Sequence, residues 1–177
     1  NIGEVVQWFW SLFEQKKAVL PKDSDVKFYA KSVKDAFKFT IKIPNSITLT
    51  HFYNKDKTAE LKPNPFFLKT DLFEKFLETL KPIHKNIGLL MFQFEYLNKQ
   101  KLSGLDEFIN RFETFIQTLD KKFIYGIEIR NPNFLKKPYF DFLERNNLAM
   151  VFLEGYYMPQ VWQVFNEFKN QINTTTV

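Results

Sequence analysis

The feature that most constrains the fold is a repeated alternation of short apolar segments with longer amphipathic segments. Five stretches have the alternating or continuous apolar pattern of β-strands. These stretches are Gly3–Trp10, Phe37–Ile43, Ile87–Gln93, Phe123–Ile129 and Leu148–Leu153. Their alternation with helical segments, at the spacing of roughly 30 residues typical of strand-helix-strand units, predicts an α/β fold. We expect a parallel sheet with outer helices.

The segments between the predicted strands carry apolar residues at helical spacing. The predicted helices cover residues 24–33, 70–84, 103–119, 138–147 and 159–172. Ser103, followed three residues later by Asp106, resembles a capping box at one helix start. Residues 45–69 are predicted to form a long loop. Loops of this length are typical of binding loops or lids, and disorder is the alternative.

The composition is that of a globular protein with an aromatic core. The 177 residues include 22 Phe, and the net charge is +5, which permits an acidic or phosphate-bearing partner. Most of that charge is lysine interspersed with Glu and Asp, which favours ordinary solvated helix surfaces. Arginine occurs only at positions 111, 130 and 145.

Two absences in the sequence limit the function classes. The chain has no cysteine, which excludes disulfides and thiolate chemistry and fits a reducing, cytoplasmic location. No apolar run reaches the length of about 18 residues that a membrane-spanning helix needs. We therefore expect no membrane contact, and the sequence does not define an oligomeric state.

The stretch Phe123–Phe134, FIYGIEIRNPNF, is the strongest site signal. By the two-residue period of a strand, Glu128 and Arg130 share one face, whereas Tyr125 and Ile127 lie on the other. Asn-Pro-Asn then ends the strand. α/β barrels present functional groups in this way, at the carboxyl ends of strands.

Polar residues of the other predicted strands join this face. Lys42 is expected about 10 Å from Glu128 at the backbone, because adjacent strands lie about 4.8 Å apart and one strand separates them. Glu128 and Lys42 are the predicted catalytic residues, since a carboxylate beside cations suits a general base or an anion clamp. The predicted substrate-binding residues are Glu4, Gln93, Arg130 and Asn131. The alternative is an interior ion pair of Glu128 with Lys42 or Arg130 that has no catalytic role.

Metal chemistry is not the favoured interpretation, and no metal ligand is assigned. Only His51 and His84 exist, too few for a histidine-rich zinc site, and His84 is expected at the C-terminus of a helix. A carboxylate-only Mg²⁺ site formed by Glu95, Glu128 and Glu154 is the one alternative, so the cofactor is left unknown.

Four residues just beyond the predicted strand ends are candidates for stacking on a base or sugar. They are Tyr96, Tyr156, Tyr157 and Met158. The favoured interpretation is that they pack beneath the long loop.

The order and spacing of the motifs resemble the family called domain of unknown function 72 (DUF72). The resemblance extends from Glu4 to about Phe168. Its most specific motifs are Lys-x-Pro at Lys42, Phe-Gln at Gln93 and Glu-x-Arg-x-Pro at Glu128. The family is similar to (β/α)8 barrels, which implies a TIM-like barrel. The resemblance further implies a single barrel domain over residues 1–177 that lacks one upstream strand and the downstream strands.

The chain also departs from the family pattern at the edge of the polar site. Four positions differ from the residues usual in the family: Val6 for Asn, Glu95-Tyr96 for Pro-Pro, Asn131 for His, and Leu49 for His. The resemblance thus implies a site whose edges are rebuilt in this chain.

Two functions remain open from the sequence. The first is a barrel enzyme, a hydrolase or lyase, acting on an anionic or phosphorylated substrate at the carboxyl face of the strands. The alternative is a non-catalytic module that binds nucleic acid or a phosphometabolite. An enzyme predicts a converged pocket with a perturbed carboxylate, whereas a nucleic-acid binder predicts lysines gathered on one exposed face.

Overall fold

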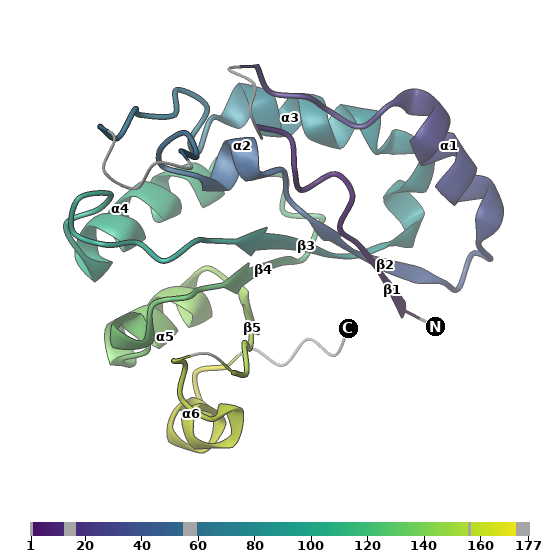
Figure 1. The fold of residues 1–177 in the computed structure, drawn as a ribbon. Helices are drawn as coiled ribbons and strands as arrows, with labels where there is room; N and C mark the ends of the chain where they lie inside the picture. Colours follow the sequence, from purple (N-terminus) through teal and green to yellow (C-terminus); the bar gives the residue numbers. More distant parts are fainter. Residues whose placement is uncertain (1, 13–16, 55–59, 156, 173–177) are drawn as a thin grey trace. The chain divides into compact units, whose positions relative to one another are not determined.

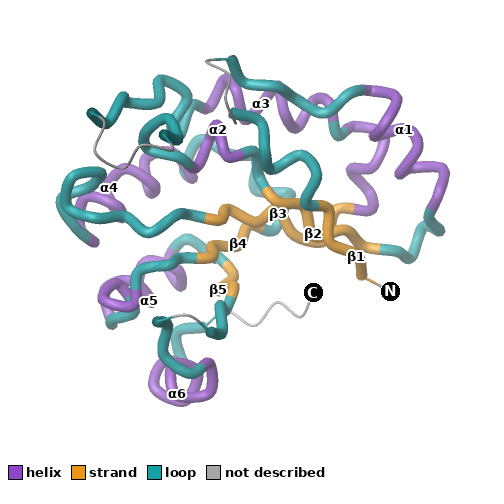
Figure 2. The backbone as a smooth tube through the Cα atoms, viewed as in Figure 1, coloured by secondary structure: helices purple, strands orange, loops and turns teal. Residues whose placement is uncertain are grey.

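The computed structural model describes residues 2–12, 17–54, 60–155 and 157–172. The chain forms two compact units, residues 1–90 and 91–176. Hydrogen bonds join five strands in chain order, β1-β2-β3-β4-β5 (Figures 1 and 2). The printed register of both β1 with β2 and β4 with β5 is parallel, which confirms the predicted pairing. The α/β class with helices flanking a parallel sheet is therefore confirmed, and barrel closure stays a prediction.

The first unit begins with β1 (Ile2–Val5), paired with β2 (Lys38–Lys42). A Cβ at Gly3 would come within 2.7 Å of the Phe37 ring, so a larger residue at this position would require that ring to shift. On β2, Phe39 and Ile41 are buried on the apolar face, as the alternation predicts.

Helices of the first unit cover that apolar face. Helix α1 (Asp23–Ser32) packs on the 3-10 helix η1 (Lys81–Asn86), and α2 (Asn45–Thr48) follows β2 directly. Helix α3 (Thr70–Thr79) precedes η1.

The second unit holds most of the aromatic core. Strand β3 (Ile87–Gln93) crosses the boundary between the units, and α4 (Leu105–Ile116) follows it. The Phe92 ring contacts the rings of Phe112 and Phe115 on α4 edge-on, at centroid distances of 5.1 and 5.8 Å. These rings fix α4 on one face of β3, because large flat side chains dominate the buried area.

The remaining elements continue the alternation. Strand β4 (Tyr125–Glu128) is followed by the 3-10 helix η2 (Pro132–Phe134) and α5 (Lys137–Arg145). Strand β5 (Ala149–Val151) leads to α6 (Val161–Phe168). None of the described helices is long and apolar enough to span a membrane.

The structure differs from the prediction in three segments, each for a local reason. The strand predicted over Gly3–Trp10 ends at Val5, because the chain turns there and the Phe9 N–H donates to the Val6 carbonyl at 2.9 Å. The helix predicted to reach His84 ends at Thr79, and Pro82 lies in the first turn of the 3-10 helix that follows. Residues 45–69 are not one loop, since α2 occupies their start and His51 bridges Pro63; residues 55–59 lie outside the described chain.

The capping residue of α4 also differs from the prediction. Glu107, not Asp106, closes the turn: its Oε2 accepts from both the Ser103 N–H and the Ser103 hydroxyl, each at 2.7 Å. The difference arises because Gly104, rather than Ser103, is the residue that precedes the first turn. These two bonds lower the pKa of Glu107.

An ion pair joins α4 to α5. Arg145 donates from Nε and Nη2 to the two oxygens of Glu113 at 2.7 and 3.0 Å, and Asn146 donates to the same carboxylate at 2.7 Å. The hydrogen bond from Arg145, followed by that from Asn146, holds the pKa of Glu113 below its usual value of 4.5. A carboxyl group with a lowered pKa in the folded state stabilises the fold above pH 4.5 and loses that contribution as the pH falls.

We therefore predict that Glu113→Gln lowers the free energy of unfolding by about 0.5–1 kcal/mol at pH 7, the usual range for a partly exposed ion pair. The difference from the wild-type chain should shrink as the pH falls below about 4.5. Urea titrations monitored by circular dichroism at pH 7 and pH 3.5 measure it. Glu167→Gln on the exposed side of α6 is the control and should change neither value. A difference that stays constant between the two pH values would contradict the prediction.

Candidate functional site

Glu128 is the last residue of β4, and it is almost completely buried, with 7% of its surface exposed. The neighbouring Tyr125 ring lies 6.1 Å from the Phe92 ring, so that face of β4 belongs to the aromatic core. By strand alternation Glu128 points to the opposite face. All four residues of β4 are buried, so the division of the strand into an apolar face and a polar face stays a prediction.

Arg130 is the partner of this buried carboxylate. Its Nε donates to Glu128 Oε1 at 3.2 Å, and its side chain is 38% exposed. A buried carboxylate is costly unless it is paired, so the pair is required where Glu128 lies. The contact uses Nε, and the terminal nitrogens Nη1 and Nη2 take no part in it. Glu128 therefore contacts one edge of the guanidinium, through Nε.

Gln93 lies at the carboxyl end of β3, beside Glu128 at the carboxyl end of β4. It is the last residue of β3, and the next residue, Phe94, donates its N–H to the Glu128 carbonyl at 2.9 Å. Gln93 is half-buried, whereas the Phe94 ring contacts the rings of Phe108 and Phe112 on α4. The structure thus places Gln93 and Glu128 at the carboxyl ends of neighbouring strands, with Arg130 two residues beyond Glu128. Their common role in a site stays a prediction.

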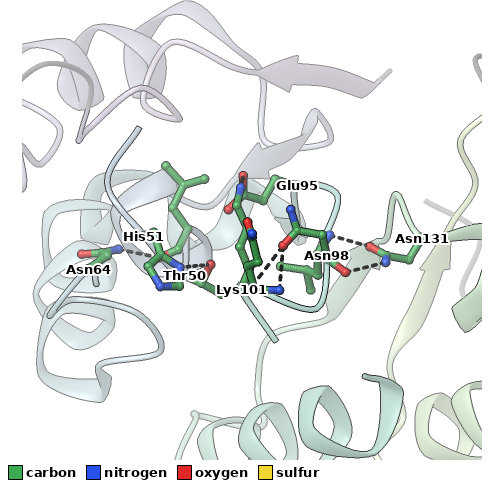
Figure 3. Close-up of polar contacts among 10 residues, drawn as sticks. Thr50, His51, Asn64, Glu95, Asn98, Lys101 and Asn131 are labelled. Atoms are coloured by element: carbon green, nitrogen blue, oxygen red, sulfur yellow. Dashed lines mark hydrogen bonds and ion pairs between the residues drawn. The ribbon is translucent and has the colours of Figure 1, made fainter. Parts of the chain in front are cut away.

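Asn131 lies next to Arg130 and has a defined structural contact. Its Oδ1 accepts from the Leu97 N–H at 2.8 Å, and its Nδ2 donates to the Leu97 carbonyl at 2.9 Å (Figure 3). Asn131 is 1% exposed, and both of its polar atoms are used in these two bonds. The pair ties the loop after β3 to the end of β4, and the role of Asn131 in substrate binding stays a prediction.

Lys42 and Glu4, in the first unit, form an ion pair of their own. Lys42 Nζ lies 3.0 Å from Glu4 Oε1, and the lysine side chain is the more buried of the two. The parallel register places Glu4 opposite Thr40 on β2, two residues before Lys42. The predicted proximity of Lys42 to Glu128 stays a prediction.

A pocket opens beside Arg130 at the carboxyl ends of β4 and β5. Its volume is about 230 Å³, and it is lined by Arg130, Leu153, Tyr157 and Met158. Arg130, Tyr157 and Met158 were predicted as candidate site residues, whereas Leu153 was assigned to the core of the last predicted strand. Leu153 lies two positions beyond the end of β5, and this place near a strand end is the feature that could have identified it from the sequence.

Two tyrosines beyond the strand ends meet each other. The rings of Tyr96 and Tyr157 lie edge to face, with centroids 5.8 Å apart and planes at 85°. Their exposed fractions are 47% and 58%. The predicted packing of these residues beneath the loop over 45–69 stays a prediction. Tyr156 lies outside the described residues.

The described residues hold no group of three side chains able to ligate a metal ion. Glu95 forms an ion pair with Lys101 (Figure 3), and Glu128 pairs with Arg130, so two of the three carboxylates considered for Mg²⁺ face cations. Glu154 is exposed. The alternative Mg²⁺ site therefore has no support from the geometry.

The two histidines bond to neighbouring groups. His84 Nε2 lies 2.9 Å from the Leu77 carbonyl near the end of α3, as predicted for a histidine at a helix C-terminus. His51 Nδ1 lies 2.9 Å from the Thr50 hydroxyl (Figure 3). Asn64, which belongs to the first unit and is also labelled in Figure 3, donates from Nδ2 to the Leu49 carbonyl at 2.6 Å.

We predict that Asn131→Ala lowers the free energy of unfolding by about 1–3 kcal/mol, because it leaves a buried N–H and a buried carbonyl of Leu97 unsatisfied. Urea denaturation measures the loss, and hydrogen exchange of the Leu97 amide locates it. Asn133→Ala, an exposed asparagine two residues further on, is the control. Unchanged protection of the Leu97 amide in Asn131→Ala would show that the two hydrogen bonds do not hold this loop.

Comparisons with known proteins place these features in a family. A family model described as "Protein of unknown function DUF72" matches residues 19–175. A 3.10 Å crystal structure of a DUF72 family protein from Enterococcus faecalis V583 is similar, with a TM-score of 0.55 and 17% identity. A 2.52 Å structure of the same protein has a TM-score of 0.52 and 20% identity.

The alignments cover 90% and 86% of this chain and 52% and 55% of the longer protein. The chain thus spans about half the length of that protein, and at this identity the likeness concerns the fold alone. No curated protein matches the chain.

Proposed function

The chain belongs to the DUF72 family, a family of unknown function, and from the geometry of its site we propose that it binds a small anionic substrate at Arg130. The substrate carries a phosphate or carboxylate group. In the favoured form of the proposal the protein is a hydrolase or lyase of the barrel type.

The observation that carries the proposal is the ion pair between Arg130 and the buried Glu128. A planar guanidinium held at one edge presents its other nitrogens in the fork geometry that suits phosphate and carboxylate oxygens. The pocket beside it lies at the carboxyl ends of β4 and β5. Open and closed α/β sheets bind ligands at these strand ends.

In the enzymatic form, Arg130 clamps the anion and Glu128 is the general base. An anion on Nη1 and Nη2 shares the guanidinium charge, which weakens the hold of Arg130 on Glu128 and frees the carboxylate to accept a proton. Gln93, at the end of the adjacent strand, supplies an amide for substrate hydrogen bonds. Lys42, which forms an ion pair with Glu4, is the proposed second catalytic residue.

The alternative is a non-catalytic module for a phosphometabolite. It is favoured by the same ion pair, because Glu128 in contact with Arg130 acts as a positioning residue and no proton transfer is needed. Nucleic acid is the less favoured ligand. Several exposed lysines pair with carboxylates, among them Lys27 with Asp23 and Lys137 with Asp141, as on ordinary solvated helix surfaces.

Inorganic phosphate is the simplest probe of the anion site. We predict that Arg130→Met raises its dissociation constant about tenfold or more, since hydrogen bonds to charged groups contribute about 1.5–3 kcal/mol. The measurement is a phosphate titration followed through the backbone amide resonances of Tyr157 and Met158. Arg111→Met, which removes the exposed partner of Glu107 on α4, is the matched control and should bind as the wild-type chain does.

Glu128→Gln separates the site from a purely structural pair, because it keeps the shape of the side chain and removes its charge. The variant should remain folded and lose anion binding or turnover. Equal phosphate affinity in the wild-type chain and Arg130→Met would contradict the proposal. Unfolding of Glu128→Gln would show that the pair serves only the fold.

A further inference from the structure

Among the described residues, Arg130 is the one charged residue that lines the pocket. The other described lining residues are Leu153, Tyr157 and Met158, and each of these side chains offers mainly carbon or a polarisable sulfur. A site for inorganic phosphate alone would be expected to surround the anion with donors. The apolar walls therefore indicate that part of the ligand is itself apolar.

The shape of that apolar part follows from the tyrosine pair. Tyr157 lines the pocket, and its ring meets Tyr96 edge to face while both remain about half exposed. An edge-to-face contact leaves ring surface available, and a planar group is the partner that stacks on such a surface.

Hydrogen bonds hold the backbone next to Tyr96 and next to Tyr157. Leu97, next to Tyr96, is fixed by the two hydrogen bonds of Asn131. On the other side, Gly155 has a φ of 100°, a conformation that favours glycine, and its carbonyl accepts from the Met158 N–H at 3.2 Å. The hydrogen bond between Met158 and Gly155 thus positions the backbone on either side of Tyr157, which lines the same pocket as Arg130.

The volume of the pocket is sufficient for a small ligand. An engineered cavity of about 150 Å³ in another protein accommodates benzene. The pocket beside Arg130 measures about 230 Å³, which leaves room for one ring and one anionic group.

From these contacts we infer that the ligand of the Arg130 site is a small phosphomonoester whose carbon part is a planar aromatic ring. This inference rests on the proposed anion site and names its substrate class. Arg130 takes the phosphate, and Tyr157 with Tyr96 takes the ring. Aryl phosphates and small heteroaromatic phosphates both belong to this class of ligand.

The test compares two monoesters of equal charge type, phenyl phosphate and glycerol 3-phosphate, with inorganic phosphate as reference. Their dissociation constants are measured by amide resonance titration in the wild-type chain and its variants. We expect phenyl phosphate to bind at least tenfold more tightly than glycerol 3-phosphate. This ratio should fall to about one in Tyr157→Ala and return in Tyr157→Phe, which keeps the ring. Trp162→Ala, an exposed aromatic residue on α6, is the control and should keep the ratio.

The outcomes separate this inference from the proposed function. If the two esters bind equally to the wild-type chain and both depend on Arg130, the aromatic inference is wrong and the anion site stands. If the ratio survives in Tyr157→Ala, the ring binds elsewhere and the inference is likewise wrong. If none of the three probes depends on Arg130, both the inference and the proposed anion site are overturned.

Discussion

Parallel pairing of short strands is the constraint on which the rest of the structure depends. Two parallel neighbours cannot be joined by a tight turn, so each strand is followed by a helical crossover before the next strand begins. The strands β4 and β5 consequently end at the same edge, where Arg130 and Leu153 follow them. The pocket is built from residues that these strand ends place together, although they lie more than twenty positions apart in the chain.

At this edge one electrostatic requirement organises the side chains. Glu128 is buried, and a buried carboxylate without a partner would be costly. Arg130 meets that requirement through Nε, and Asn131 then ties the adjacent loop to the end of the strand. The pair therefore satisfies the buried carboxylate and also lies beside the pocket lined by Arg130.

The local parts of this arrangement were predictable from the sequence. The two-residue period placed Glu128 opposite Tyr125, and the helical stripes identified α4 and α5. Boundaries failed where local patterns are ambiguous: the apolar run Gly3–Trp10 turns after Val5. Contacts between distant residues could not be predicted, because no local pattern encodes them. Asn131 bonding to Leu97, 34 residues earlier, is such a contact.

The central claim is that buried Glu128 holds Arg130 through Nε in a fixed orientation. Hydrogen exchange at the arginine Nε–H, followed by ¹H–¹⁵N resonance spectroscopy, tests it most directly. Arg111, whose ion pair with Glu107 uses Nη2 on an exposed helix surface, is the internal reference. We predict that the Nε–H of Arg130 exchanges more slowly than that of Arg111, and that Glu128→Gln removes the difference. Equal exchange at the two arginines in the wild-type chain would contradict the account.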